Sequence, residues 1–205
     1  MNAIYSTLFS RIIAGEYAEG TRLRESAIAL EFQVSRTPIR EVFRMLEQDG
    51  LVHIAPRKGV VVFPFTADEV EDIYQIRESL ELSALKTCVP VLSLQRLIEI
   101  RGKVHETGQS SSAGLHTQVD SILHQYLIES SRRRRLIAML GSLSRLTQRF
   151  RELGFQDDTV RKRATAEHLD LIDALCARDL DRSCGILTRH IQNSKMRVLD
   201  RLVGG

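Results

Sequence analysis

The sequence predicts a mainly helical protein in two parts: a winged helix-turn-helix over residues 1–65 and an all-helical bundle over residues 66–205. Three observations support this fold class. Apolar residues recur at helical spacing along most of the 205 residues. β-Branched runs are confined to residues 51–63, and no residue after Pro90 is a proline.

The composition indicates a globular protein, with 43% hydrophobic and 27% charged residues. No apolar run approaches the roughly 20 residues of a membrane helix, and the start does not resemble a signal peptide. Cys88, Cys176 and Cys184 are odd in number and form no C-x-x-C pair, which favours reduced thiols. We therefore expect a cytoplasmic protein without a membrane segment. The net charge of only +3 does not by itself indicate nucleic-acid binding.

The first part reads as three helices followed by a hairpin. Helical spacing covers residues 4–14 and again 26–32. Ser35 offers an N-cap for a third helix, with Pro38 in its first turn and Gly50 just past its end. The runs 51–54 and 60–63 then flank the turn 56–59. This order is typical of a winged helix-turn-helix.

The second part shows only helical patterns. Thr66 and Glu69 form a capping box that opens the first of its helices, and another helix follows Ser93. Residues 108–114 read as a polar linker. Further helices are expected over residues 115–130, 135–153, 159–178 and 181–202.

The proposed third helix combines a core-packing face with a row of arginines. Its apolar stripe consists of Ile39, Val42, Phe43 and Leu46, and the neighbouring stripe consists of Arg36, Arg40 and Arg44. Such a helix suits base and phosphate contacts in a DNA groove. The alternative is an ordinary amphipathic helix whose surface is neutralised by glutamates.

The hairpin adds to the DNA interpretation. Arg57 and Lys58 stand at its tip, where they can grip phosphate or enter a groove, and Gly59 permits a tight turn. Residues 1–65 hold eight basic and seven acidic side chains, so the prediction depends on where the arginines lie and not on total charge.

Four residues of the second part form a candidate metal site. Asp120 and His124 are four residues apart and so share a helix face. His168 and His190 lie at similar distances on either side of the expected turn 178–181, which places them at one level of an antiparallel pair. One carboxylate and three imidazoles suit a divalent transition metal: Zn, Ni, Mn or Fe. Three unrelated histidines are the alternative.

The first part resembles the DNA-binding domain of GntR-family regulators. The matching segments are residues 12–17, 20–25, 34–41, 46–52 and 56–62, although Glu19 stands where that family usually has proline. The resemblance implies that Ser35, Arg36, Thr37 and Arg40 contact an operator, together with Arg57, Lys58 and Gly59 of the wing.

Residues 66–202 resemble the ligand-binding FCD domain of the FadR subfamily. The matches are residues 73–81, Asp120 with His124, residues 167–175 and residues 189–191. Metal-containing members carry the same Asp-His-His-His set, whereas acyl-CoA-binding members lack it. The resemblance further implies that Arg77 faces a cavity and holds an effector carboxylate; a pair with Glu81 is the alternative, and both roles are compatible.

Some residues depart from the FCD pattern. The run Arg132–Arg135 replaces a usual Gly-Asn turn, and we interpret it as a solvated charge run, with an anion contact as the alternative. His105 and His116 match no ligand position, so we expect them at the surface.

Together these features predict a homodimeric regulator that binds a palindromic double-stranded operator and is controlled, as a repressor, by a small carboxylic-acid metabolite at the metal site. Two alternatives stay open: a metal that is structural or is itself the signal, and a metalloenzyme with a DNA-binding module. No nucleophile motif or general base is marked out by spacing, which favours the non-enzyme interpretations.

Overall fold

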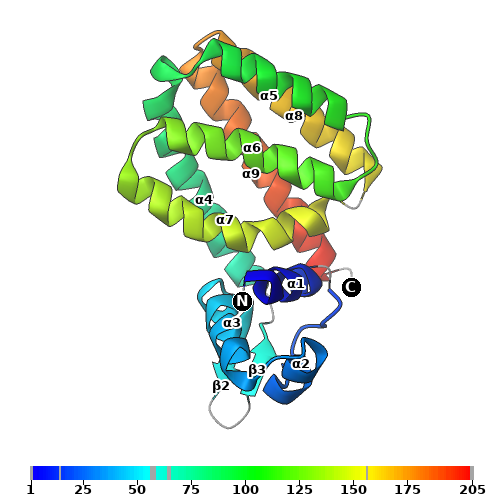
Figure 1. The fold of residues 1–205 in the computed structure, drawn as a ribbon. Helices are drawn as coiled ribbons and strands as arrows, with labels where there is room; N and C mark the ends of the chain where they lie inside the picture. The colour runs from blue at the N-terminus through cyan, green and yellow to red at the C-terminus, as the bar shows by residue number, and fades with distance from the viewer. Residues whose placement is uncertain (1, 14, 56–58, 64–65, 156, 204–205) are drawn as a thin grey trace. The chain divides into compact units, whose positions relative to one another are not determined.

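The computed structural model describes residues 2–13, 15–55, 59–63, 66–155 and 157–203. The chain divides into two compact units, Met1–Thr66 and Ala67–Gly205. Both consist mainly of helices, as predicted (Figure 1). None of the helices in these ranges is long and apolar enough to cross a membrane.

The first unit is a winged helix-turn-helix. Its elements are α1 (Asn2–Ile13), β1 (Arg22–Leu23), α2 (Glu25–Glu31), α3 (Arg36–Gln48), β2 (Val52–Ala55) and β3 (Gly59–Val62). The strands form an antiparallel sheet in the order β1-β3-β2, with Val61 opposite both Arg22 and His53. The sequence predicted the β2–β3 hairpin but missed β1, because two residues are too short to show alternation.

One apolar core holds the first unit together. Leu8 and Ile12 of α1 pack with Phe43 and Leu46 of α3 and with Val62 of β3, and each is at most 1% exposed. The turn between α2 and α3 contains Gln33 in the left-handed region, with φ of 53°. This core fixes the angle at which α3 presents its outer face.

The second unit is a bundle in which every described element is helical. The elements are α4 (Ala67–Cys88), a 3-10 turn η1 (Val89–Val91), α5 (Leu94–Thr107), α6 (Ala113–Ser130), α7 (Arg134–Gly154), α8 (Asp158–Cys176) and α9 (Leu180–Val203). Helix α9 packs against α4, α7 and α8, while α6 packs against α4, α5 and α7 (Figure 1). The predicted linker is shorter than expected, since α6 already begins at Ala113.

The turn between α8 and α9 is braced by an arginine. Arg178 has φ of 59°, and its guanidinium donates to the carbonyl oxygens of Val89 and Leu92 in η1 and just after it. The hairpin of α8 and α9 is thereby tied to the end of α4. The thiols of Cys88, Cys176 and Cys184 are free.

Candidate functional site

Helix α3 presents the predicted DNA-reading residues at the surface. Ile39, Val42, Phe43 and Leu46 are buried, as the periodicity indicated. Ser35, Arg36, Thr37 and Arg40 are all exposed at or near the start of the helix. Arg57 and Lys58 of the wing lie outside the described residues.

Two of the three arginines in the predicted row are engaged in ion pairs. Arg40 Nε donates to both carboxylate oxygens of Glu25, at 3.0 and 2.9 Å. Arg44 Nη1 donates to Glu41 Oε1 at 2.7 Å. Exposed pairs of this kind are worth at most about 1 kcal/mol, so they orient the guanidiniums without preventing a phosphate from replacing the carboxylate.

The structure adds two arginines that the sequence did not single out. Arg22 and Arg24 line a cleft of about 400 Å³ together with Arg36. None of the three has an ion pair with the described residues. Gly59 adjoins the same cleft with φ of +82°, and a Cβ there would lie 3.2 Å from Arg22 Nε. Gly59 thus leaves room for the Arg22 side chain.

In the second unit, Asp120, His124, His168 and His190 come together in the bundle interior. One ligand atom from each lies within 4.8 Å of the others, and all four residues are at most 4% exposed. Asp120 and His124 share a face of α6, while the other two come from α8 and α9. The turn lies at residues 177–179, so it begins one residue and ends two residues earlier than expected. The His168 and His190 rings are still at one level, with their centroids 4.5 Å apart.

A single carboxylate oxygen faces all three imidazoles. Asp120 Oδ1 lies 3.7 Å from His124 Nε2, 3.2 Å from His168 Nε2 and 3.4 Å from His190 Nε2. The second oxygen, Oδ2, forms an ion pair with Arg151 Nε at 2.8 Å. The carboxylate therefore presents one oxygen to the imidazoles and the other to a buried cation.

Two further carboxylates orient the histidine rings. His124 Nδ1 lies 2.6 Å from Glu81 Oε2, and His190 Nδ1 lies 2.9 Å from Glu167 Oε2. Each pairing places a proton on Nδ1, so in a neutral ring the lone pair lies on Nε2. Nε2 of His124 also lies 3.3 Å from Arg77 Nη2. Helical spacing in the sequence could not predict these two contacts, because each joins residues on two different helices.

Burial and the neighbouring charges shift the pKa values of the four residues in different directions. Burial, together with the charge of His190, lowers the pKa of His168 to about 4. Burial also lowers the pKa of His124, whereas in His190 the carboxylates of Asp120 and Glu167 outweigh burial and raise the pKa. Burial opposes ionisation of Asp120, but Arg151 and the imidazoles hold its pKa well below the usual value.

These residues fit a metal ion. Nε2 of His168 and Nε2 of His190 are buried and make no hydrogen bond with the described residues. An ionised carboxylate oxygen and imidazole nitrogens directed to one point are the ligands that borderline divalent metals prefer.

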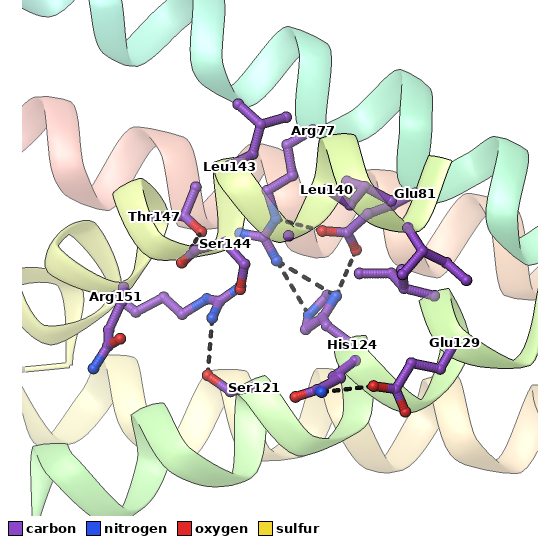
Figure 2. Close-up of a pocket in the computed structure, with 15 residues that line it drawn as sticks. Arg77, Glu81, Ser121, His124, Glu129, Leu140, Leu143, Ser144, Thr147 and Arg151 are labelled. Atoms are coloured by element: carbon purple, nitrogen blue, oxygen red, sulfur yellow. Dashed lines mark hydrogen bonds and ion pairs between the residues drawn. The ribbon is translucent and has the colours of Figure 1, made fainter. Parts of the chain in front are cut away.

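A cavity of about 240 Å³ adjoins the cluster (Figure 2). His124 belongs to both, and Arg77, Glu81 and Arg151 also line the cavity. Figure 2 shows Arg77, Glu81 and His124 pointing toward one another. Its apolar lining is supplied by Ile128, Ile137, Leu140 and Leu143.

Arg77 lies in the cavity wall and also pairs with Glu81. Its Nε donates to Glu81 Oε1 at 2.6 Å, and the two side chains are 2% and 4% exposed. Its Nη1 is buried and makes no hydrogen bond with the described residues. Arg151, which the sequence did not indicate, is held by Asp120 and donates through Nη1 to Ser121 Oγ at 2.9 Å.

The remaining polar residues have mixed outcomes. Arg132–Arg135 are exposed, and His105 is exposed as expected. The surface assignment of His116 is wrong: it is 5% exposed, its Nε2 lies 3.0 Å from the carbonyl oxygen of Ser110, and its ring packs on Phe155. It serves the fold and does not join the cluster.

A winged helix-turn-helix followed by a helical unit with a cavity is typical of a DNA-binding transcriptional regulator. Residues 1–62 match the family of bacterial regulatory proteins named gntR, and residues 72–193 match the FCD domain. The chain therefore belongs to the GntR family, in the FadR subfamily that carries an FCD domain. Members of this family are transcriptional regulators and not enzymes, which removes the metalloenzyme alternative.

Known relatives agree with this assignment. YdhC of Bacillus subtilis, an uncharacterised HTH-type transcriptional regulator, is 30% identical over 168 residues, covering 80% of this chain and 75% of YdhC. The transcriptional repressor RspR of Escherichia coli is 25% identical over 192 residues, covering 92% and 84%. The structure of E. coli McbR/YncC superimposes with a TM-score of 0.79 at 20% identity, covering 97% of this chain and 96% of that one.

Proposed function

We propose that the protein is a homodimeric repressor whose affinity for a palindromic operator is controlled by a small carboxylic acid bound beside a metal ion. The observation that carries this proposal is that His124 belongs both to the buried Asp/His cluster and to the wall of the adjoining cavity. An acid in the cavity would therefore lie next to a metal ligand.

The DNA surface would be the outer face of α3 with the wing. Ser35, Arg36, Thr37 and Arg40 are exposed at the end of the helix that enters a major groove in helix-turn-helix proteins. Two subunits related by a two-fold axis would read two half-sites. Arg57, Lys58 and Gly59 of the wing belong to the same proposal, and Arg22 and Arg24 would add phosphate contacts.

Asp120, His124, His168 and His190 would hold the metal, with Zn, Ni and Mn as the candidates. The ion would supply a concentrated positive charge to which a carboxylate can coordinate. The protein's own arginines are less available, because Arg77 is offset by Glu81 and Arg151 by Asp120. The residues of the cavity wall would then orient the acid beside the metal.

The cavity wall indicates what kind of acid fits. Arg77 keeps Nη1 free of hydrogen bonds with the described residues, which suits one carboxylate oxygen of the acid. The apolar side around Leu140 and Leu143 would receive a short carbon body. A cavity of about 240 Å³ favours a small metabolite over a long acyl chain.

Control of DNA binding requires that the acid bind two conformations of the dimer with different affinity. Repression relieved by the acid is the direction we propose, in keeping with the repressor RspR among the relatives. A metal that is purely structural, or that is itself the signal, is the competing proposal.

Thermal unfolding with a panel of carboxylic acids, with and without EDTA, separates these proposals. If an acid binds at the metal, it raises the Tm by about 3–6 °C at ten times its Kd, and only while the metal is present. Stabilisation by metal alone, with no acid effective, would favour the structural metal. Stabilisation that EDTA leaves unchanged would refute the metal-dependent site.

A further inference from the structure

A second cavity lies between α8 and α9, and no function proposed above uses it. Its volume is about 190 Å³. It shares no lining residue with the effector cavity, the cavity of about 240 Å³ lined by Arg77, Glu81 and His124. Thr159 and Arg163 of α8 and Asn193 and Arg197 of α9 provide its hydrogen-bond donors. Asp200, which is exposed, is the one carboxylate among the described residues that line it.

Arg197 is the feature that calls for an explanation. Its Nη1 is buried without a hydrogen bond to the described residues, and its guanidinium carbon lies 6.0 Å from the centre of the Phe155 ring. No carboxylate of the described residues forms an ion pair with it, whereas Arg77 and Arg151 each have one within 2.8 Å. Arg197 is half-buried, and the carboxylate of Glu167 is the main negative charge acting on it. A buried guanidinium nitrogen without a hydrogen bond usually meets an anion or water.

The other donors make the cavity suitable for a phosphate group. Arg163 and Arg197 supply two planar guanidiniums, the geometry that binds phosphate oxygens in pairs. Asn193 and Thr159 line the same cavity and bring an amide and a hydroxyl, both of which can donate hydrogen bonds to anion oxygens. The volume is several times the ~30 Å³ of a water molecule, which leaves room for phosphate or a small phosphomonoester.

The same donors connect this cavity to the metal cluster. Asn193 Nδ2 donates to Glu167 Oε1 at 2.6 Å, and Arg163 Nε lies 3.3 Å from that oxygen. The other oxygen of Glu167 accepts from His190 Nδ1 at 2.9 Å. An anion that engages Arg163 and Asn193 would therefore free Glu167 to hold His190 more strongly, and would bring negative charge toward the cluster.

We propose that the α8–α9 cavity is a binding site for a phosphate group, free or esterified, and that its occupation strengthens metal binding through Glu167 and His190. The site is separate from the effector cavity, so it can exist whether or not an acid binds there. By reciprocity, metal binding strengthens phosphate binding by the same factor.

Calorimetric titration of the full-length protein with inorganic phosphate tests the site directly. Arg197→Gln should weaken phosphate binding at least about tenfold, since a charge-assisted contact is lost. Arg182→Gln, which removes an exposed arginine from the same helix, should leave it unchanged. Should Arg197→Gln fail to fold, Arg163→Gln serves instead, because that side chain is 64% exposed. An absence of phosphate binding, or equal binding in all variants, would overturn the proposal.

Parallel titrations identify the anion. Glycerol 3-phosphate binding more tightly than inorganic phosphate assigns the site to a phosphomonoester, and the reverse assigns it to free phosphate. Acetate should not compete with either. Competition by acetate at similar concentration would contradict the phosphate assignment.

The link to the metal is tested by titrating Co²⁺ into metal-free protein and following its visible absorption. Phosphate should raise the Co²⁺ affinity about fivefold or more, the lower end of usual coupling energies. Arg197→Gln should abolish the increase, and it also controls for complexation of cobalt by free phosphate. Unchanged or weaker cobalt binding in the wild type would refute the coupling even if phosphate binds.

Discussion

Asp120 contacts both the three imidazoles and the guanidinium of Arg151 in the bundle interior. One oxygen faces three imidazoles and the other holds Arg151, and both partners of this pair are at most 4% exposed. A buried ion pair gains little over apolar packing, but the loss of one partner leaves an uncompensated charge. The pair is therefore better explained by what it positions than by the stability it adds.

Replacing Arg151 by leucine should destabilise the second unit by about 3–5 kcal/mol, because Asp120 loses its counter-ion. Urea denaturation of metal-free protein measures this. Arg101→Leu is the matched control: it removes the Arg101–Asp173 pair, in which both side chains are 48% exposed, and should change stability by at most about 1 kcal/mol. Equal effects of the two substitutions would contradict our account.

His168→Ala should abolish stoichiometric metal binding, since it removes one of the four proposed ligands. Elemental analysis of wild-type protein purified without chelator should give about one ion per subunit. His105→Ala, an exposed histidine of α5, should keep the full content. A His168→Ala protein with full occupancy would refute the assignment.

Arg22 and Arg40 should both contribute to DNA binding, in different ways. Arg40→Ala should weaken operator binding by about 1–3 kcal/mol if the guanidinium reads a base edge. Arg22→Ala should weaken binding to any duplex and lower the slope of log K against log salt by about one, as expected for a phosphate contact. Fluorescence anisotropy over a range of salt concentrations measures both, with Arg101→Ala as control. An unchanged slope in Arg22→Ala would exclude that contact.

At the scale of elements, two helix N-termini with the same residue behave differently. Ser93 caps α5, its hydroxyl accepting from Arg96 N at 3.3 Å, whereas Ser35 at the start of α3 makes no side-chain cap hydrogen bond. The hydroxyl of Ser35 is thus available to DNA. The sequence indicated that Ser35 lies at the N-cap position, but it did not indicate that its hydroxyl makes no cap hydrogen bond.

Ser93→Ala should therefore cost about 1 kcal/mol of stability without affecting DNA binding. Ser35→Ala should cost less than about 0.5 kcal/mol yet weaken operator binding. Thermal unfolding and anisotropy on the two variants give both quantities. The opposite pattern would show that Ser35 is structural.

The helices and the Asp/His cluster were predictable because both depend on periodicity. A spacing of four residues places Asp120 and His124 on one helix face. Similar sequence distances from the turn between α8 and α9 place His168 and His190 at the same level of the helix pair. The partners Glu81, Arg151 and Glu167 were not predictable as a set, since they approach the cluster from three different helices. His116 was misplaced because nothing in its spacing indicates that Phe155 covers it.

At the scale of the whole molecule, the two units should respond separately to metal. Each has its own core, and the candidate cluster lies wholly within residues 67–205. EDTA should lower the Tm of the second unit and leave that of the first unchanged. Differential scanning calorimetry of the intact chain, with a fragment of residues 67–205 to assign the transitions, measures this. A shift of both transitions would show that the units unfold as one.

Glu81 has a consequence for anyone who redesigns this regulator as a biosensor. One of its oxygens holds the cavity arginine, Arg77, and the other holds the ring of His124. Replacing Arg77 in order to change the proposed ligand site would leave Glu81 with a stronger hydrogen bond to His124, and would therefore also disturb the proposed metal site. Substitutions meant to change ligand specificity should therefore start with apolar lining residues such as Leu140 and Leu143. These side chains form no hydrogen bond to a carboxylate, so their replacement should not disturb His124.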